Sequence, residues 1–174
     1  MRSACDDRAP RPAAAGRIAA ALLGVFLVGC AGASVTAPTE RLAFTDHGAT
    51  QMSSNDGGPR IVVATDARGR AELATLLPSV PQADDRAYVA VFAGSQRTGG
   101  YAVRVDAVER TGDRLVVHAT FTAPAPGALT IQVLTSPAHL VSVASTAVVG
   151  VREAVVVDQS GAERARGSVT QSRS

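Results

Sequence analysis

The sequence predicts an α+β domain that is mostly β, with an antiparallel sheet and one packed helix. Residues 101–107 and 115–121 each alternate between apolar and polar side chains, as half-buried strands do. Thr111-Gly112-Asp113 between them predicts a turn, so the two strands should form a long antiparallel hairpin. After the N-terminal segment, only residues 67–77 show the spacing of apolar side chains that indicates a helix. Several strands and a single helix define this fold class.

The N-terminal segment has the features of a secretory signal peptide. Arg2, Arg8, Arg11 and Arg17 precede an apolar run over residues 18–28. That run is too short for a bilayer, which needs about 20 apolar residues. It ends in Leu27-Val28-Gly29-Cys30, which resembles the lipobox of bacterial lipoproteins.

This resemblance implies that residues 1–29 are a lipoprotein signal peptide and that Cys30 is acylated. Residues 30–40 are small and polar, and we expect them to form a lipidated, flexible tether. Acyl chains on Cys30 would hold the protein at the cell membrane, facing the periplasm or the exterior. The membrane is therefore one expected partner.

Charge and residue usage exclude several classes of function. Loss of residues 1–29 leaves 13 arginines and 13 acidic residues, so the net charge of +2 belongs to the signal segment and nucleic-acid binding is not expected. The chain contains no lysine, which excludes a P-loop lysine and a Schiff base. Cys30 would be the only cysteine of the processed chain, so we expect no disulfide, no cysteine-bound zinc and no cofactor.

The rest of the chain reads as strands with turns, and we assign the domain to residues 41–158. Asp66 is a predicted N-cap for the helix, and Pro78 ends it. Residues 88–92 are apolar on both faces, which predicts a central strand covered on both sides. Further strands are predicted within 41–53 and at 61–63, 129–133, 140–144 and 148–157, with a hairpin turn at 55–58 before the strand at 61–63. Residues 159–174 are polar, and we predict a disordered tail.

The glycine-rich segment 94–101 has two interpretations. Gly99 and Gly100 can form a turn that requires a positive φ, or the loop can bind a partner through exposed Arg97, Thr98 and Tyr101. A phosphate loop is excluded, since Gly100 stands where a lysine would be needed.

No catalytic or metal site is predicted. His47, His118 and His139 lack a metal-ligand spacing, and His139 more plausibly has a hydrogen-bonded structural role. A set of Ser136, His139 and Asp106 could be selected, but any β domain of this size allows such a selection. We therefore expect the protein not to be an enzyme.

A Thr-Gly-Gly-Tyr turn, an alternating hairpin, a proline-rich break and a Thr-Ser-Pro turn follow one another over residues 92–143. In this order they resemble the PrcB family, named for a protease complex subunit. The matching residues are Gly94, Thr98, Gly99, Gly100, Tyr101, Val103, Val105, Val108, Leu115, Val117, Pro124, Thr135, Ser136, Pro137, His139 and Val141.

The resemblance implies a membrane-anchored, non-catalytic lipoprotein whose domain binds protein, associating with a secreted protease or another envelope protein and stabilising it. Alternatives are a protease inhibitor, and an envelope lipoprotein that binds a ligand or is purely structural. The expected contact residues are those of two loops, Arg97, Thr98, Gly99, Gly100 and Tyr101 in the first and Thr135, Ser136, Pro137 and His139 in the second. If both loops lie at one end of the sheet, that end is the predicted binding surface.

Overall fold

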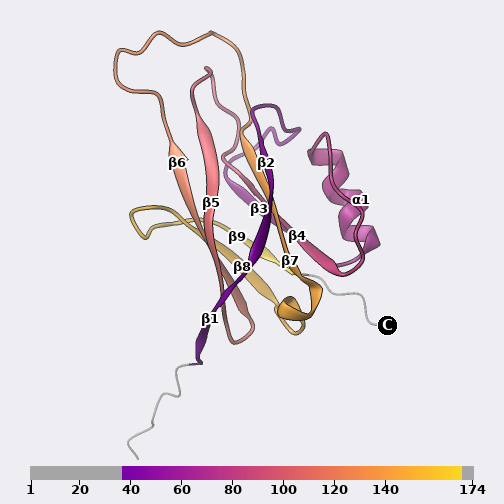
Figure 1. Ribbon diagram of the computed structural model, residues 1–174. Coiled ribbons are helices and arrows are strands. Elements are labelled where there is room, and N and C mark those ends of the chain that lie inside the picture. Colours follow the sequence, from indigo (N-terminus) through magenta and orange to yellow (C-terminus); the bar gives the residue numbers. More distant parts are fainter. Residues whose placement is uncertain (1–36, 170–174) are drawn as a thin grey trace, which may run out of the picture. The chain divides into compact units, whose positions relative to one another are not determined.

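The computed structural model describes residues 37–169, which form two sheets and one α-helix (Figure 1). Cys30 and the signal segment lie outside the described residues. The strands are β1 (Thr39–Leu42), β2 (Phe44–Thr50), β3 (Arg60–Ala64), β4 (Arg86–Phe92), β5 (Ala102–Thr111), β6 (Arg114–Thr122), β7 (Ala138–Ala144), β8 (Glu153–Val157) and β9 (Glu163–Ser168). The helices are α1 (Ala67–Leu76) and the 3₁₀ turn η1 (Ser145–Val148). The mostly β fold with a packed helix is confirmed.

The strands are divided between two sheets, where the sequence suggested one. The first sheet has the order β1-β5-β6-β8-β9, and the second has the order β2-β7-β4-β3. All pairs are antiparallel except β6 with β8, which are parallel. Aliphatic side chains from both sheets share one core, which includes Val89, Val141, Val105 and Val117. The two sheets therefore pack face to face.

The predicted central strand is β4, and both of its faces are covered. Val89 and Val91 face the core between the sheets. Tyr88, Ala90 and Phe92 face the other way, toward Leu73 and Leu77 at the helix. Both faces of β4 are apolar because each face packs into a separate cluster of buried apolar side chains.

Helix α1 begins and ends where its signals predict. The Asp66 carboxylate accepts a 2.7 Å hydrogen bond from the Gly69 N–H, as an N-cap does. The Leu77 N–H donates to the Leu73 carbonyl at 3.1 Å just before Pro78. The long hairpin is confirmed as well, since β5 pairs with β6 from Ala102 to Thr111. Gly112 has a φ of 63° in its turn, which favours glycine.

The strand predicted at residues 129–133 does not form. These residues lie in a long irregular segment between β6 and β7 that projects beyond the sheets (Figure 1). Their alternation suits a strand, but their backbone makes other contacts. The Ile131 carbonyl accepts hydrogen bonds from the Gly99 N–H at 3.0 Å and from the Val133 N–H at 3.1 Å, and the second bond closes a turn at Gln132. The segment therefore packs on the 94–101 loop and does not extend beside a strand.

The predicted disordered tail is wrong over residues 163–168, which form edge strand β9. The sequence did not predict this strand because its residues are polar. Backbone pairing with β8 and ion pairs stabilise it, rather than the burial of apolar side chains. Arg166 contacts Glu153 at 2.6 Å and Glu163 at 2.9 Å. Charged edge strands of this kind are common because they discourage association with other chains.

Three smaller expectations need correction. Residues 55–58 are not a hairpin turn, because β2 and β3 lie at opposite edges of the second sheet. The strand predicted at 148–157 begins only at Glu153, after η1, and Val149 is exposed. The predicted tether overlaps β1, which begins at Thr39 and pairs with β5.

Candidate functional site

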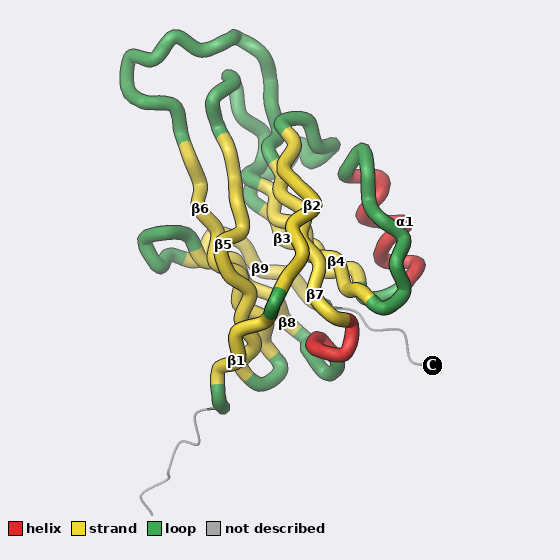
Figure 2. Tube along the Cα trace, viewed as in Figure 1, coloured by secondary structure: helices red, strands yellow, loops and turns green. Residues whose placement is uncertain are grey.

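The two loops that carry the family-like motifs meet at one end of the sheets. The Gln96 N–H donates to the Thr135 carbonyl at 2.7 Å, and the Thr135 N–H donates back to Gln96 at 2.9 Å. The Thr135 hydroxyl also donates to the Thr98 carbonyl at 3.0 Å. We call this end, formed by residues 51–58, 94–101 and 123–137, the loop end (Figure 2).

The glycines of the first loop are required by close packing and by backbone conformation. Gly94 has a φ of 83°, and a Cβ there would lie 2.7 Å from the carbonyl carbon of Gly58. A Cβ on Gly99 would lie 2.8 Å from Cγ1 of Ile131. Gly100 has a φ of 89°. The turn interpretation of this loop therefore holds, and the turn brings the two loops into contact.

Most of the second-loop candidates are buried and connect parts of the domain to one another. The Ser136 hydroxyl lies 2.6 Å from the Asn55 carbonyl oxygen and 2.7 Å from the Ser53 hydroxyl. Thr135, Ser136 and Pro137 are all buried. These residues build the loop end from within, and Thr135 and Ser136 also line a depression on its surface.

His139 also lies inside, where it joins the two sheets. Its Nδ1 accepts a hydrogen bond from the Val105 backbone N–H at 3.1 Å, so its other nitrogen, Nε2, carries the proton toward Asp46 at 3.1 Å. The side chain is 3% exposed. His139 is therefore not among the exposed side chains of the loops, and its hydrogen-bonded structural role is confirmed.

The serine, histidine and aspartate considered as a catalytic set are each held by other groups. Ser136 bonds to Asn55 and Ser53, and His139 bonds to Val105 and Asp46. Asp106 accepts from the Thr120 hydroxyl at 2.6 Å and pairs with Arg104 at 2.7 Å. Within residues 37–169, no cluster of three or more His, Cys, Asp or Glu side chains could hold a metal ion.

The first-loop candidates are the ones a partner could reach. Arg97 and Gly100 are exposed, and Thr98 and Tyr101 are half-buried. Arg97 forms no ion pair with any described residue. One cationic side chain thus stands free at the loop end.

Sequence reasoning missed the exposed apolar side chains beside this arginine-bearing loop. Met52 is 62% exposed and Leu134 is 67% exposed, and together they border a shallow depression of about 200 Å³. Ser54, Asp56 and Ser95 supply polar groups to its lining. Pro124, Pro126 and Pro137 surround the apolar segment that contains Leu134. Because proline is rare inside sheets, these residues could have indicated that the segment is exposed.

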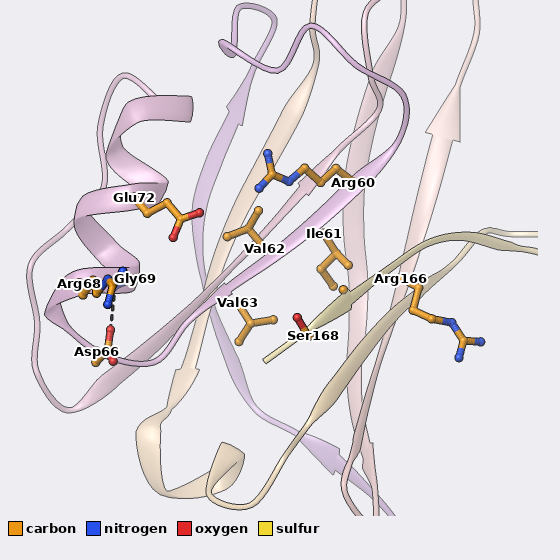
Figure 3. A pocket seen from close by; sticks show the side chains of 11 residues that line it. Arg60, Ile61, Val62, Val63, Asp66, Arg68, Gly69, Glu72, Arg166 and Ser168 are labelled. Carbon is orange, nitrogen blue, oxygen red and sulfur yellow. Dashed lines mark hydrogen bonds between the residues drawn. The ribbon is translucent and has the colours of Figure 1, made fainter. Parts of the chain in front are cut away.

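A larger hollow of about 440 Å³ lies elsewhere, between β3, the start of α1 and β9 (Figure 3). Two of its five charged side chains have identified roles within the domain. Asp66 caps the helix, and Arg166 bonds to Glu153 and Glu163. None of the predicted contact residues lines this hollow, which is the seam where the edges of the two sheets approach each other.

No helix among the described residues is long and apolar enough to cross a membrane. A protein-family model described as PrcB C-terminal matches residues 87–144. No curated protein and no solved structure gave a match to the chain. The matched segment begins in β4, contains the β5–β6 hairpin and ends at the last residue of β7, so it includes both motif-bearing loops. The match agrees with the family predicted from the sequence, and residues 87–144 of this chain are similar to the PrcB C-terminal family.

Proposed function

We propose that the chain is a non-catalytic protein-binding subunit of the cell envelope, which is lipid-anchored through Cys30 and associates with and stabilises a secreted protease. The match of residues 87–144 to the PrcB C-terminal family supports an association with a protease complex. The single observation that carries the binding surface is the loop end. There, the two loops that carry the family motifs are hydrogen-bonded to each other, and Met52 and Leu134 line a shallow depression beside them.

The chemistry of this surface suits a protein partner. Exposed apolar side chains rimmed by polar groups are typical of protein interfaces, and arginine is enriched at their centres. Arg97 provides that charge next to Ser95, which lines the depression. A partner that buries Met52 and Leu134 would exclude water from both and could pair an acidic group with Arg97.

The position of β1 supports a model in which the loop end lies away from the proposed membrane anchor. Thr39 pairs with Thr111 at the far end of β5, whereas the loop end adjoins Ala102 at its near end. Ten residues of strand at about 3.4 Å each separate these ends by roughly 30 Å. A chain tethered before Thr39 would therefore hold its loop end toward soluble partners.

The mechanism of stabilisation is mass action. A protein that binds only the folded form of a protease lowers the fraction of that protease that is unfolded. This requires no chemistry from the lipoprotein. Rigid β-strands position the loops, and the loops supply the contacts.

Affinity recovery from detergent extracts tests the proposal. The full chain, tagged at its C-terminus, is expected to recover a secreted protease whose lifetime falls when the gene is deleted. Cys30→Ser should release the chain from the membrane fraction, and a chain that stays bound would disprove the anchor. Failure to recover any protein reproducibly would leave a ligand-binding or structural lipoprotein.

A protease inhibitor is the second candidate, favoured by the irregular segment between β6 and β7. It projects beyond the sheets and exposes Leu129 and Ile131 (Figure 1). An exposed extended segment is what a protease cleft accepts. Deletion of the gene for this chain distinguishes the two functions. It should raise the activity of a protease that the chain inhibits and lower the activity of a protease that the chain stabilises.

A further inference from the structure

We infer that the peptide bond between Leu129 and Thr130, in the segment that joins β6 to β7, is a processing site for an endopeptidase with a large apolar S1 pocket. The two pieces that result stay folded together. This inference does not depend on the proposed protease partner.

The first observation is an exposed tip that is held at both of its ends. Pro124 and Thr130 are half-buried and lie against Gly100, where an added Cβ would be 3.3 Å from Pro124 and 3.7 Å from Thr130. The five residues between them, 125–129, are all exposed. Exposed loop tips of small residues are preferred sites of proteolytic cleavage.

The second observation is that the backbone of the tip has only a local hydrogen bond. The Ala128 N–H donates to the Ala125 carbonyl at 3.0 Å, inside the tip itself. Leu129 makes no backbone hydrogen bond to any residue of the described part of the chain. Because no contact with the sheets has to break, the tip can enter a protease cleft at little cost in local unfolding.

The third observation is the side chain that selects the bond. The tip reads Ala-Pro-Gly-Ala-Leu, so Leu129 is its one large apolar residue. Its side chain is 104% exposed. An S1 pocket that accepts a large apolar side chain therefore finds a single candidate in the tip, and the bond that follows it is Leu129–Thr130.

Other exposed apolar side chains lack the free backbone. The residues that follow Met52 and Leu134 each donate their N–H to a distant carbonyl at 2.9 Å. The Ile131 carbonyl accepts two hydrogen bonds, and the Val149 carbonyl accepts one from Arg110 at 2.9 Å. Cleavage beside any of them has to break a contact that holds the domain together.

The topology explains why the two pieces remain together. The second piece contains β7, which lies between β2 and β4 of the first piece, and β8, which pairs with β6. Val141 and Val156 of the second piece share a core with Val89 and Val117 of the first. Each sheet thus contains strands from both pieces, so the cut leaves the core intact.

The reaction is a hydrolysis without a redox change. The bond between the Leu129 carbonyl carbon and the Thr130 nitrogen breaks. Water supplies a hydroxyl group to the carbon and a proton to the nitrogen, which gives a carboxylate and an ammonium group. The endopeptidase provides the catalytic groups, and the new carboxylate forms on an exposed residue where water can solvate it.

Chymotrypsin, whose S1 pocket is a hydrophobic slot, is a suitable probe. The full chain is treated briefly at a low enzyme ratio, and the products are identified by mass spectrometry. We expect the first cut within residues 37–169 to follow Leu129, and Leu129→Ala to slow cleavage of this bond at least tenfold. Val149→Leu is the control. It places a leucine at a position that is 62% exposed but has a bonded backbone, and it should give no new rapid cut.

Size-exclusion chromatography and urea denaturation test whether the pieces stay together. The cut chain should elute as one species at the volume of the parent, although a denaturing gel separates the pieces. Because it unfolds into two molecules, its urea midpoint should rise with protein concentration, whereas the midpoint of the parent should not.

Three results would overturn the inference. One is a first cut elsewhere within residues 37–169, or a Leu129→Ala chain that is cut at this bond as fast as the parent. Another is separation of the pieces without denaturant. The third is an uncut bond with loss of chymotrypsin activity, which would identify the segment as an inhibitory loop.

Discussion

The imidazole of His139 in β7 accepts the backbone N–H of Val105 in β5 at 3.1 Å, so one side chain hydrogen-bonds the two sheets together. The contact lies at a bulge in β5, between Val105 and Ala107, where the pairing with β6 is irregular. Removal of the ring would leave a buried N–H without a partner. An unsatisfied buried donor costs about 1–3 kcal/mol, to which the vacated volume adds.

We predict that His139→Ala lowers the free energy of unfolding by about 3 kcal/mol, from the lost hydrogen bond and the cavity together. Urea denaturation measures this. His118→Ala is the matched control, because His118 is 41% exposed and bonds only to Glu109 at 3.3 Å. Equal effects of the two substitutions would contradict the structural role of His139.

Gly94→Ala should destabilise the protein more than Gly127→Ala does. Both glycines have φ near 80°, but only Gly94 has backbone atoms within 3 Å of the position of an added Cβ. The left-handed conformation alone costs about 1–2 kcal/mol, and overpacking adds about 1–3 kcal/mol. The difference between the two unfolding free energies isolates the packing contribution. A difference near zero would show that Gly94 matters for conformation alone.

The double substitution Met52→Ser and Leu134→Ser should abolish recovery of a partner without changing stability. Both side chains are exposed, and surface changes of this kind usually alter the unfolding free energy by less than about 0.5 kcal/mol. Val149→Ser is the control. Val149 is 62% exposed but lies at the opposite end, where Arg110 binds its carbonyl. Loss of recovery with the control variant as well would argue against a localised surface.

Acid should weaken the β8–β9 edge. The Ser160 hydroxyl lowers the pKa of Asp158 below its usual 3.8, and a hydrogen bond from Arg166 lowers the pKa of Glu163 below its usual 4.5. A pKa lowered in the folded state gives stability that is present above the unfolded value and lost as the pH falls through the folded one. Asp158→Asn/Glu163→Gln should therefore lose less stability between pH 7 and pH 3 than the parent chain does. Both carboxylates are exposed, so we expect a small difference, read from urea midpoints at the two pH values.

The features that could be predicted from the sequence are those encoded by neighbouring residues. The β5–β6 hairpin and α1 each depend on a local pattern and a local turn or cap. The same holds for the family motif, whose residues lie within one continuous stretch.

The features that were missed depend on distant partners. The strand pattern at 129–133 is overridden by the hydrogen bonds of the Ile131 carbonyl to Gly99 and Val133, whereas polar β9 becomes a strand because it pairs with β8. At the candidate site, the sequence left open whether Thr135 and Ser136 lie beside the first loop. Their burial follows from Ser53 and Asn55, which arrive from elsewhere in the chain. The exposure of Met52 and Leu134 also depends on how distant segments pack around them, which a local sequence pattern does not reveal.

The place of β1 in the first sheet also determines how the domain responds to mechanical force. Thr39 to Leu42 pair antiparallel with Thr111 to Val108, and the preceding chain leaves from the end of that ladder. The case to consider is a pull on that chain directed along the axis of β1. All four residue pairs are then loaded in shear and must break together, whereas a pull across the sheet would break them one at a time. A short strand in this orientation resists tension better than its length suggests.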